Sequence, residues 1–73
     1  MSPDRLVTMA NQIGRFFESQ GGDEAVSGTL DHIEKFWDPR MRREIVAYLA
    51  SGGEGLAPNV RAAVAALKPV AAD

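Results

Sequence analysis

The absence of cysteine is the feature that most constrains how this chain of 73 residues can fold. A domain of that size buries only about 60% of the surface that its unfolded chain exposes, so small domains usually depend on disulfides, a metal or a partner. Without cysteine there is no disulfide and no thiolate ligand, and the single histidine, His32, is too few for a structural zinc site. The sequence therefore predicts a fold stabilised by close helix packing, by a partner surface, or by both.

Charge and hydropathy narrow the class of protein further. The formal net charge is −2, so no overall field draws the chain to nucleic acid. The start of the chain has neither the basic flank nor the apolar stretch of a signal peptide, and its longest apolar run, residues 62–67, is far shorter than a membrane span. We therefore expect a cytoplasmic protein that contacts neither membrane nor nucleic acid, and the missing cysteines agree with a reducing compartment.

Hydrophobic periodicity and helix-stop residues predict an all-α fold. Apolar residues recur at helical spacing in four segments, and glycine pairs or prolines separate them. The predicted helices are Pro3–Ser19, Glu24–Trp37, Pro39–Ala50 and Pro58–Leu67. Lys68 and Pro69 should end the last helix and leave residues 70–73 as a short tail. No segment alternates with period two, so we expect one domain, residues 1–73, built as a small bundle of about four short helices.

Polar caps and one proline predict where these helices begin. Ser2, Asp23 and Asp38 stand directly before predicted helices and are the residue types preferred at N-caps. Asp38 also precedes a proline, and the residue before proline is disfavoured in the helical region. The second helix must therefore end there, while the proline suits the first position of the third helix. We expect a tight Asp-Pro corner between helices two and three.

The first two predicted helices present similar apolar faces. Each stripe position of the first recurs 20 residues later in the second. The two stripes are Leu6, Met9, Ala10, Ile13, Phe16 and Phe17, then Val26, Thr29, Leu30, Ile33, Phe36 and Trp37. Two copies are too few for a solenoid, so we interpret them as two helices with similar faces. The inward residues of the other helices are predicted to be Met41, Ile45, Tyr48 and Leu49, then Val60, Val64 and Leu67.

Each of these two apolar faces ends in a pair of adjacent aromatic residues, Phe16-Phe17 in the first and Phe36-Trp37 in the second. Neighbours on a helix lie about 100° apart, so only one ring of each pair can point straight into the core. The helical wheel places Phe17 and Trp37 near the stripe centre, and Phe16 and Phe36 at its edge. Two interpretations stay open: a wide core that absorbs all four rings, or apolar surface offered to a partner.

Three arginines, Arg40, Arg42 and Arg43, open the third predicted helix. In order of preference, they fit a solvated face with local ion pairs, a protein interface, or an anion or nucleic-acid patch. The surrounding helix–corner–helix superficially resembles a DNA-reading motif, but its corner lacks the usual turn of about three to four residues.

The sequence shows no catalytic constellation. A nucleophile needs a base within reach, and His32 falls at the edge of an apolar stripe, where we interpret it as a boundary histidine. The glycine pairs lack the lysine and the serine or threonine of a phosphate loop and are interpreted as helix stops. We expect no catalytic, cofactor-binding or metal-binding residue. The predicted partner interface is Phe16, Phe36, Trp37, Arg40, Arg42 and Arg43.

Several stretches resemble one known family over nearly the whole chain. They are Met9-Ala10-Asn11-Gln12-Ile13-Gly14-Arg15-Phe16-Phe17, His32-Ile33-Glu34-Lys35-Phe36-Trp37-Asp38-Pro39-Arg40-Met41-Arg42, Leu56-Ala57-Pro58 and Ala63-Val64-Ala65-Ala66-Leu67. Together they resemble the delta subunit of NAD-dependent formate dehydrogenase, and the segment from Phe36 to Met41 is the most specific part.

The resemblance implies a complex that oxidises formate to carbon dioxide and reduces NAD. It implies an alpha subunit with a molybdenum bis-pterin cofactor and iron–sulfur clusters, a beta subunit with FMN and the NAD site, and a gamma subunit with a further cluster. The delta subunit, without a redox centre, would dock on alpha and support assembly, stability or cofactor insertion and retention. The alternatives are a transient maturation factor for alpha or, less favoured, a small helical nucleic-acid-binding module; a free-standing enzyme is the poorest option.

Overall fold

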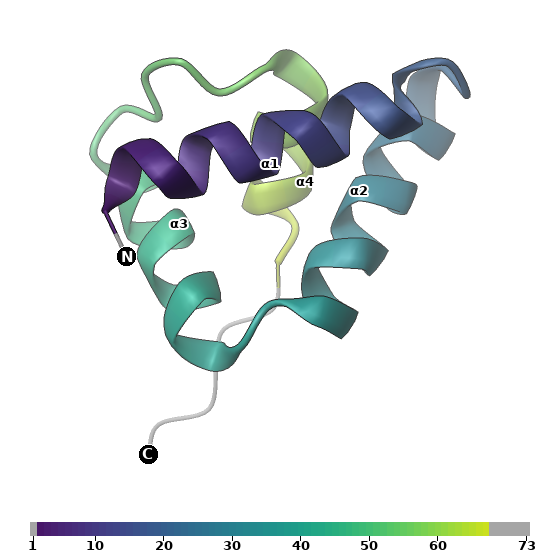
Figure 1. Ribbon diagram of the computed structural model, residues 1–73. Coiled ribbons are helices and arrows are strands. Elements are labelled where there is room, and N and C mark those ends of the chain that lie inside the picture. Colours follow the sequence, from purple (N-terminus) through teal and green to yellow (C-terminus); the bar gives the residue numbers. More distant parts are fainter. Residues whose placement is uncertain (1, 68–73) are drawn as a thin grey trace.

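The computed structural model describes residues 2–67, and this part of the chain forms four helices and no strand. The helices are α1 (Pro3–Glu18), α2 (Gly22–Phe36), α3 (Pro39–Ala50) and α4 (Pro58–Ala65). α1 lies across the others, and α2 and α3 run beneath its two ends to meet at a corner (Figure 1). α4 packs against all three other helices, and the predicted all-α fold is confirmed.

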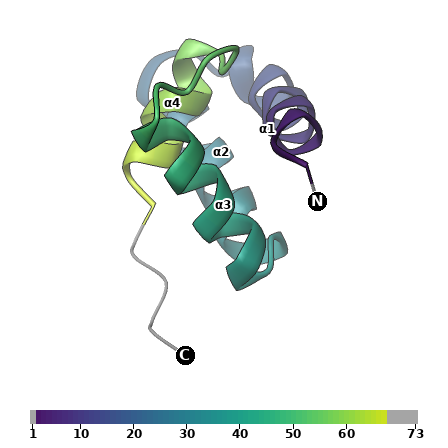
Figure 2. The same cartoon turned by 90° about the vertical axis from the view of Figure 1, so that its left-hand side faces the viewer.

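Two of the predicted helix caps are confirmed. Ser2 Oγ accepts a hydrogen bond from the N–H of Arg5 at 3.4 Å, and Asp38 Oδ1 accepts one from the N–H of Met41 at 2.8 Å. α2 ends at Phe36 and α3 begins at the proline after Asp38, so the chain turns with almost no loop. Seen from the side, α3 runs away from the corner in front of α2 (Figure 2).

The predicted cap at Asp23 is wrong. α2 begins at Gly22, before the predicted start at Glu24, because the C=O of Gly21 already accepts a hydrogen bond from the N–H of Ala25 at 3.2 Å. Gly21 and Gly22 have φ angles of 71° and 49°, a left-handed backbone that glycine adopts readily. Asp23 lies within the first turn of α2. Its negative charge interacts favourably with the positive end of the helix dipole, but no side chain makes a capping hydrogen bond there.

α4 ends at Ala65, short of the predicted Leu67. The N–H of Leu67 bonds to the C=O of Val64 at 3.1 Å, three residues back, so the last turn tightens and the regular helix stops. The predicted stop at Lys68-Pro69 and the predicted tail lie outside the described residues.

The core lies where the four helices meet. Most of its members come from the predicted apolar stripes, but α2 buries Ala25 in place of the predicted Val26. Thr29 is also fully buried, and its hydroxyl donates to the C=O of Ala25 at 2.8 Å, so its burial leaves that hydroxyl bonded. The core cluster comprises Leu6, Ala10, Ile33, Trp37, Ile45, Leu56, Val60 and Val64.

Gly14 allows α4 to approach α1 closely. A Cβ at this position would overlap Cγ2 of Val60 and lie 3.1 Å from Oδ1 of Asn59. The amide of Asn59 donates to the C=O of Gly14 at 2.8 Å. The missing side chain therefore provides both the apolar contact and the polar contact between these two helices.

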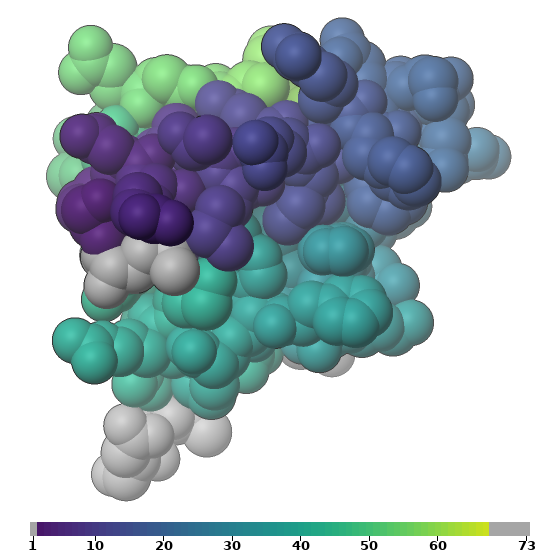
Figure 3. Space-filling model, viewed as in Figure 1, coloured from purple at the N-terminus to yellow at the C-terminus, as the bar shows by residue number. Residues whose placement is uncertain are grey.

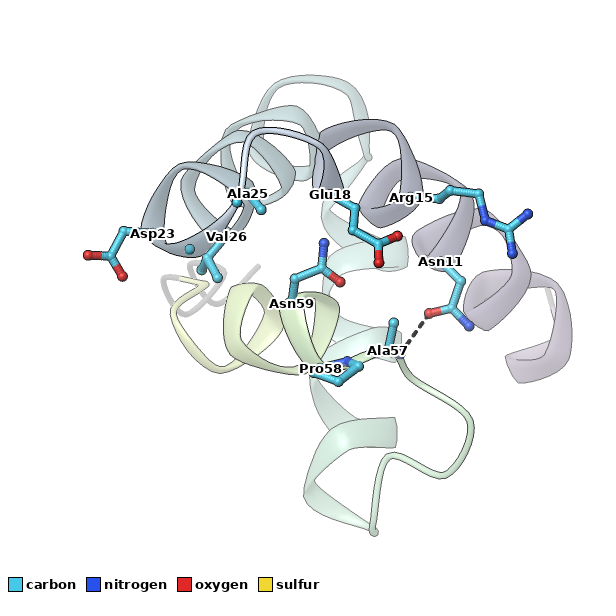
Figure 4. Close-up of a pocket in the computed structure, with 11 residues that line it drawn as sticks. Asn11, Arg15, Glu18, Asp23, Ala25, Val26, Ala57, Pro58 and Asn59 are labelled. Carbon is cyan, nitrogen blue, oxygen red and sulfur yellow. Dashed lines mark hydrogen bonds between the residues drawn. The ribbon is translucent and has the colours of Figure 1, made fainter.

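Asn11 of α1 holds the end of the loop that leads into α4. Its Nδ2 donates to the C=O of Gly55 at 2.8 Å, and its Oδ1 accepts from the N–H of Ala57 at 3.0 Å (Figure 4). Both groups of one amide are thus bonded to backbone more than 40 residues away in sequence, which fixes where α4 begins.

The beginning of the same loop is held by side chains of α3 and α4. Arg61 donates through Nη1 to the C=O of Gly53 at 2.6 Å and through Nη2 to that of Gly52 at 3.1 Å. The Tyr48 hydroxyl donates to the C=O of Glu54 at 2.6 Å. The loop is therefore secured at both ends by side chains from three helices.

We expect the substitution Gly14→Ala to destabilise the protein. The overlap with Val60 is severe, so overpacking against α4 should cost about 2–3 kcal/mol, and the better helix propensity of alanine offsets about 1 kcal/mol at most. The net loss in free energy of unfolding should be about 1–2 kcal/mol by urea denaturation, against less than about 0.5 kcal/mol for the exposed control Ser27→Ala. An unchanged midpoint for Gly14→Ala would contradict the close approach of α1 and α4.

Asn11→Asp tests the loop clamp with an isosteric change. The carboxylate keeps the acceptor for Ala57 but replaces the donor to Gly55 with a second acceptor, so stability should fall by about 1–3 kcal/mol. Gln12→Glu makes the same amide-to-carboxylate change at the exposed neighbouring position and should leave thermal unfolding nearly unchanged. Equal shifts in Tm for the two variants would show that charge, and not the clamp, is responsible.

Candidate functional site

An apolar groove of about 530 Å³ lies where α1, α2 and the start of α3 meet. On the face shown in Figure 3, α1 (purple to blue) lies against the teal segment that contains the corner. Among the described residues, no charged side chain lines this groove, and its polar side chains are Gln12 and His32. The residues of this aromatic groove are Met9, Gln12, Ile13, Phe16, Phe17, His32, Phe36, Trp37 and Met41.

Two phenylalanines give the groove its exposed apolar surface. Phe16 is 73% exposed and Phe36 is 72% exposed, and Val46 is the next most exposed large apolar residue of the described chain at 39%. The predicted division within each aromatic pair is confirmed, because Trp37 is only 5% exposed. Phe16 and Phe36 thus form one apolar patch on a small domain, and such patches mark binding surfaces.

Four rings form a continuous series of contacts through the groove. Phe16 meets Phe17 edge-to-face with ring centroids 5.0 Å apart. Phe17 lies 6.4 Å from His32, and His32 lies 4.7 Å from Phe36. Aromatic contacts at these distances are favourable, so each of the two exposed rings packs against an aromatic neighbour. The wall of the groove is therefore largely formed before any partner arrives.

Gly28 of α2 makes room for the Phe17 ring in the groove. A Cβ at Gly28 would lie 2.5 Å from Cδ1 of Phe17, so only glycine leaves room for the ring against α2. The sequence interpretation assigned no role to Gly28. An isolated glycine inside a predicted helix is the signal that indicates such a close approach.

The 20-residue repeat supplies the two walls of the groove. Gln12 and Phe16 of α1 correspond to His32 and Phe36 of α2, and all four line it. Trp37, the counterpart of Phe17, belongs to the core and supports the groove from below. Its predicted place in a partner interface stays a prediction, although it has the least exposed surface of the six residues assigned there.

None of the three arginines of the predicted interface lines the groove. We call Arg40, Arg42 and Arg43 the basic turn; the first two flank Met41, the α3 residue of the groove. Arg40 pairs with Glu44 at 3.5 Å, which confirms one expected local ion pair, and Arg43 also makes an interaction. Arg42 is half-buried, and its Nε is sheltered from solvent without a hydrogen-bond partner.

A second, polar hollow of about 590 Å³ lies between α1, the start of α2 and the start of α4 (Figure 4). Its two amides, Asn11 and Asn59, already form the structural hydrogen bonds that hold the loop and α4. Its charged lining residues are Arg15, Glu18 and Asp23. We therefore interpret this hollow as a consequence of how the helices dock.

Within residues 2–67, no group of three or more His, Cys, Asp or Glu side chains is placed to hold a metal ion. In the same range, no helix is both long enough and apolar enough to cross a membrane.

The fold and the groove together define a small all-α domain with one exposed aromatic face. Residues 5–64 match the family described as NADH-dependent formate dehydrogenase delta subunit FdsD. Because the match covers most of the chain and includes the whole aromatic groove, the chain belongs to this family, and the resemblance found in the sequence is confirmed. No curated protein and no solved structure matches the chain.

The adjacent residues Trp37 and Phe36 should respond differently to truncation. Trp37→Ala removes a core ring and should cost about 3–5 kcal/mol, a large part of the stability of a domain this small. Phe36→Ala removes a ring that is 72% exposed and should leave the helical circular dichroism and Tm nearly unchanged. Equal loss of helicity in both variants would contradict this division of roles.

Proposed function

We propose that this chain is a non-catalytic accessory subunit of a cytoplasmic NAD-dependent formate dehydrogenase, and that the aromatic groove docks on the molybdenum-containing alpha subunit. Family membership supports the place in such a complex. The observation that carries the docking proposal is the exposure of Phe16 and Phe36 on one preformed groove.

The amount of apolar surface suits a protein partner. Covering both rings would remove on the order of 200–350 Å² from water, worth roughly 5–9 kcal/mol before the cost of association. Aromatic residues are also over-represented among residues that dominate interface energies. Arg40 and Arg42, the sequence neighbours of the groove residue Met41, add a second residue type that is enriched at interfaces.

The proposal assigns the redox chemistry to the other subunits. Alpha would carry the molybdenum bis-pterin cofactor and iron–sulfur clusters, beta would carry FMN and the NAD site, and gamma would carry a further cluster. This chain has no cysteine, so its residues do not fit the ligation of iron–sulfur clusters. Its one histidine lies between the rings of Phe17 and Phe36. The contribution of the chain is then to assembly, stability, or cofactor insertion and retention.

Affinity purification of the tagged chain from its native cell tests the proposal. We expect stoichiometric recovery with alpha, beta and gamma, molybdenum and iron in the eluate, and formate-dependent reduction of NAD. The double variant Phe16→Ser with Phe36→Ser should reduce recovery at least about tenfold, since each ring is expected to contribute well over 1 kcal/mol.

Val46→Ser is the matched control, because it removes exposed apolar surface from α3 outside the groove. It should leave recovery unchanged. Equal losses for the control and the double variant would argue against groove docking, and recovery of the wild-type chain without any formate dehydrogenase subunit would overturn the proposal. Recovery only with an alpha subunit that lacks molybdenum would instead indicate a transient maturation factor.

A further inference from the structure

The basic turn places three positively charged side chains at the amino end of α3. Arg40, Arg42 and Arg43 lie within the first five residues of α3, and the first turn of this helix contains no acidic residue. The amino end of a helix already carries partial positive charge, so cations are least favourable there. The capping carboxylate of Asp38 supplies one negative charge at this end.

The three arginines and the nearby Lys35 differ in how they are paired within the chain. The pair of Arg40 with Glu44 is 3.5 Å long, and the arginine side chain is 79% exposed, so solvent screens the interaction. Lys35, one turn before the corner, is paired with Asp31 at 3.0 Å. Arg42 differs, because its Nε is withdrawn from solvent and has no hydrogen-bond partner. The chain itself covers this Nε, and because Arg42 is only half-buried, a carboxylate from a partner would bond to the end of its guanidinium.

The position of the basic turn links it to the aromatic groove. Arg40 and Arg42 flank Met41 in sequence, and Met41 is the residue through which α3 lines the groove. The groove itself has no charged lining residue among those described. A ligand in it therefore meets uncharged side chains, and the two arginines stand directly before and after the residue through which α3 reaches the groove.

We propose that the groove receives a segment of a formate dehydrogenase subunit in which large apolar side chains stand next to at least one aspartate or glutamate. The apolar side chains lie between Phe16 and Phe36, and the carboxylate pairs with Arg42, with Arg40 as a second contact. This inference rests on the proposed function and adds the chemistry of the segment that the groove recognises.

Other occupants fit these features less well. Small-molecule sites bury most of the surface of their ligand, whereas Phe16 and Phe36 in this groove are themselves 73% and 72% exposed. Nucleic acid needs several phosphate contacts, but the chain has a net charge of −2 and four acidic residues, Asp31, Glu34, Asp38 and Glu44, around the three arginines. An acidic apolar segment uses both the groove and the arginines.

Zero-length crosslinking in the assembled complex tests the carboxylate contact. Arg42→Lys and Arg40→Lys each keep the charge and introduce an amine, which a carbodiimide joins only to a carboxylate in direct contact. We expect a new crosslink from at least one position to an Asp or Glu that has apolar neighbours in a formate dehydrogenase subunit. Arg15→Lys is the matched control, since Arg15 lines the polar hollow and should give no such crosslink.

A photo-reactive phenylalanine analogue at position 36 reports separately on the groove. If it crosslinks to a formate dehydrogenase subunit while neither amine does, the carboxylate pairing is wrong and groove docking stands. If the complex is intact but position 36 gives no crosslink, both proposals fail. An amine crosslinked only to a second copy of this chain, or a salt-sensitive shift of duplex DNA that Arg42→Gln abolishes, would also overturn the inference.

Discussion

The rest of the structure depends on the backbone constraint at the Asp38-Pro39 corner. Proline prevents α2 from continuing, and the Asp38 side chain satisfies the first turn of α3, so one helix ends and another begins within two residues. The same corner turns Trp37 into the core while Phe36 stays on the surface. A continuous helix through this point would leave α3 without its packing on α1 and α4 and would remove one end of the groove.

Hydrogen bonds from side chains to distant backbone groups hold the helices together here, as disulfides do in many domains of this size. Asn11, Asn59 and Arg61 each bond a side chain to backbone on another element, and two of these links join α1 to the region of α4 across more than 40 residues. Each bond contributes about 1 kcal/mol, less than a disulfide, but their directions fix the register of α4 on α1. Gly14 completes this arrangement because its missing side chain admits Val60.

Helix propensities and hydrophobic patterns along the sequence predicted much of the fold. The features that they did not predict depend on contacts between residues far apart in sequence. Periodicity and capping chemistry identified the four helices, the corner, and the different positions of Phe36 and Trp37, because these depend on neighbours in sequence. The prediction that Asp23 caps the second helix was wrong. Aspartate is a preferred N-cap residue, but the helix already begins at Gly22, with Gly21 in the cap position. The roles of Asn11 and Gly28 could not be predicted, because each depends on which helix lies opposite.

The packing of α4 has a consequence for the order of events during synthesis. The groove is built from residues 9–41, which leave the ribosome first, yet the helices that form its walls also pack against α4, which leaves late. A nascent chain that stops before Val60 and Val64 would carry every groove residue over an incomplete core. A finished groove thus indicates that the chain has been translated through its last described helix, and a product truncated before α4 lacks the packing that holds the groove walls in place.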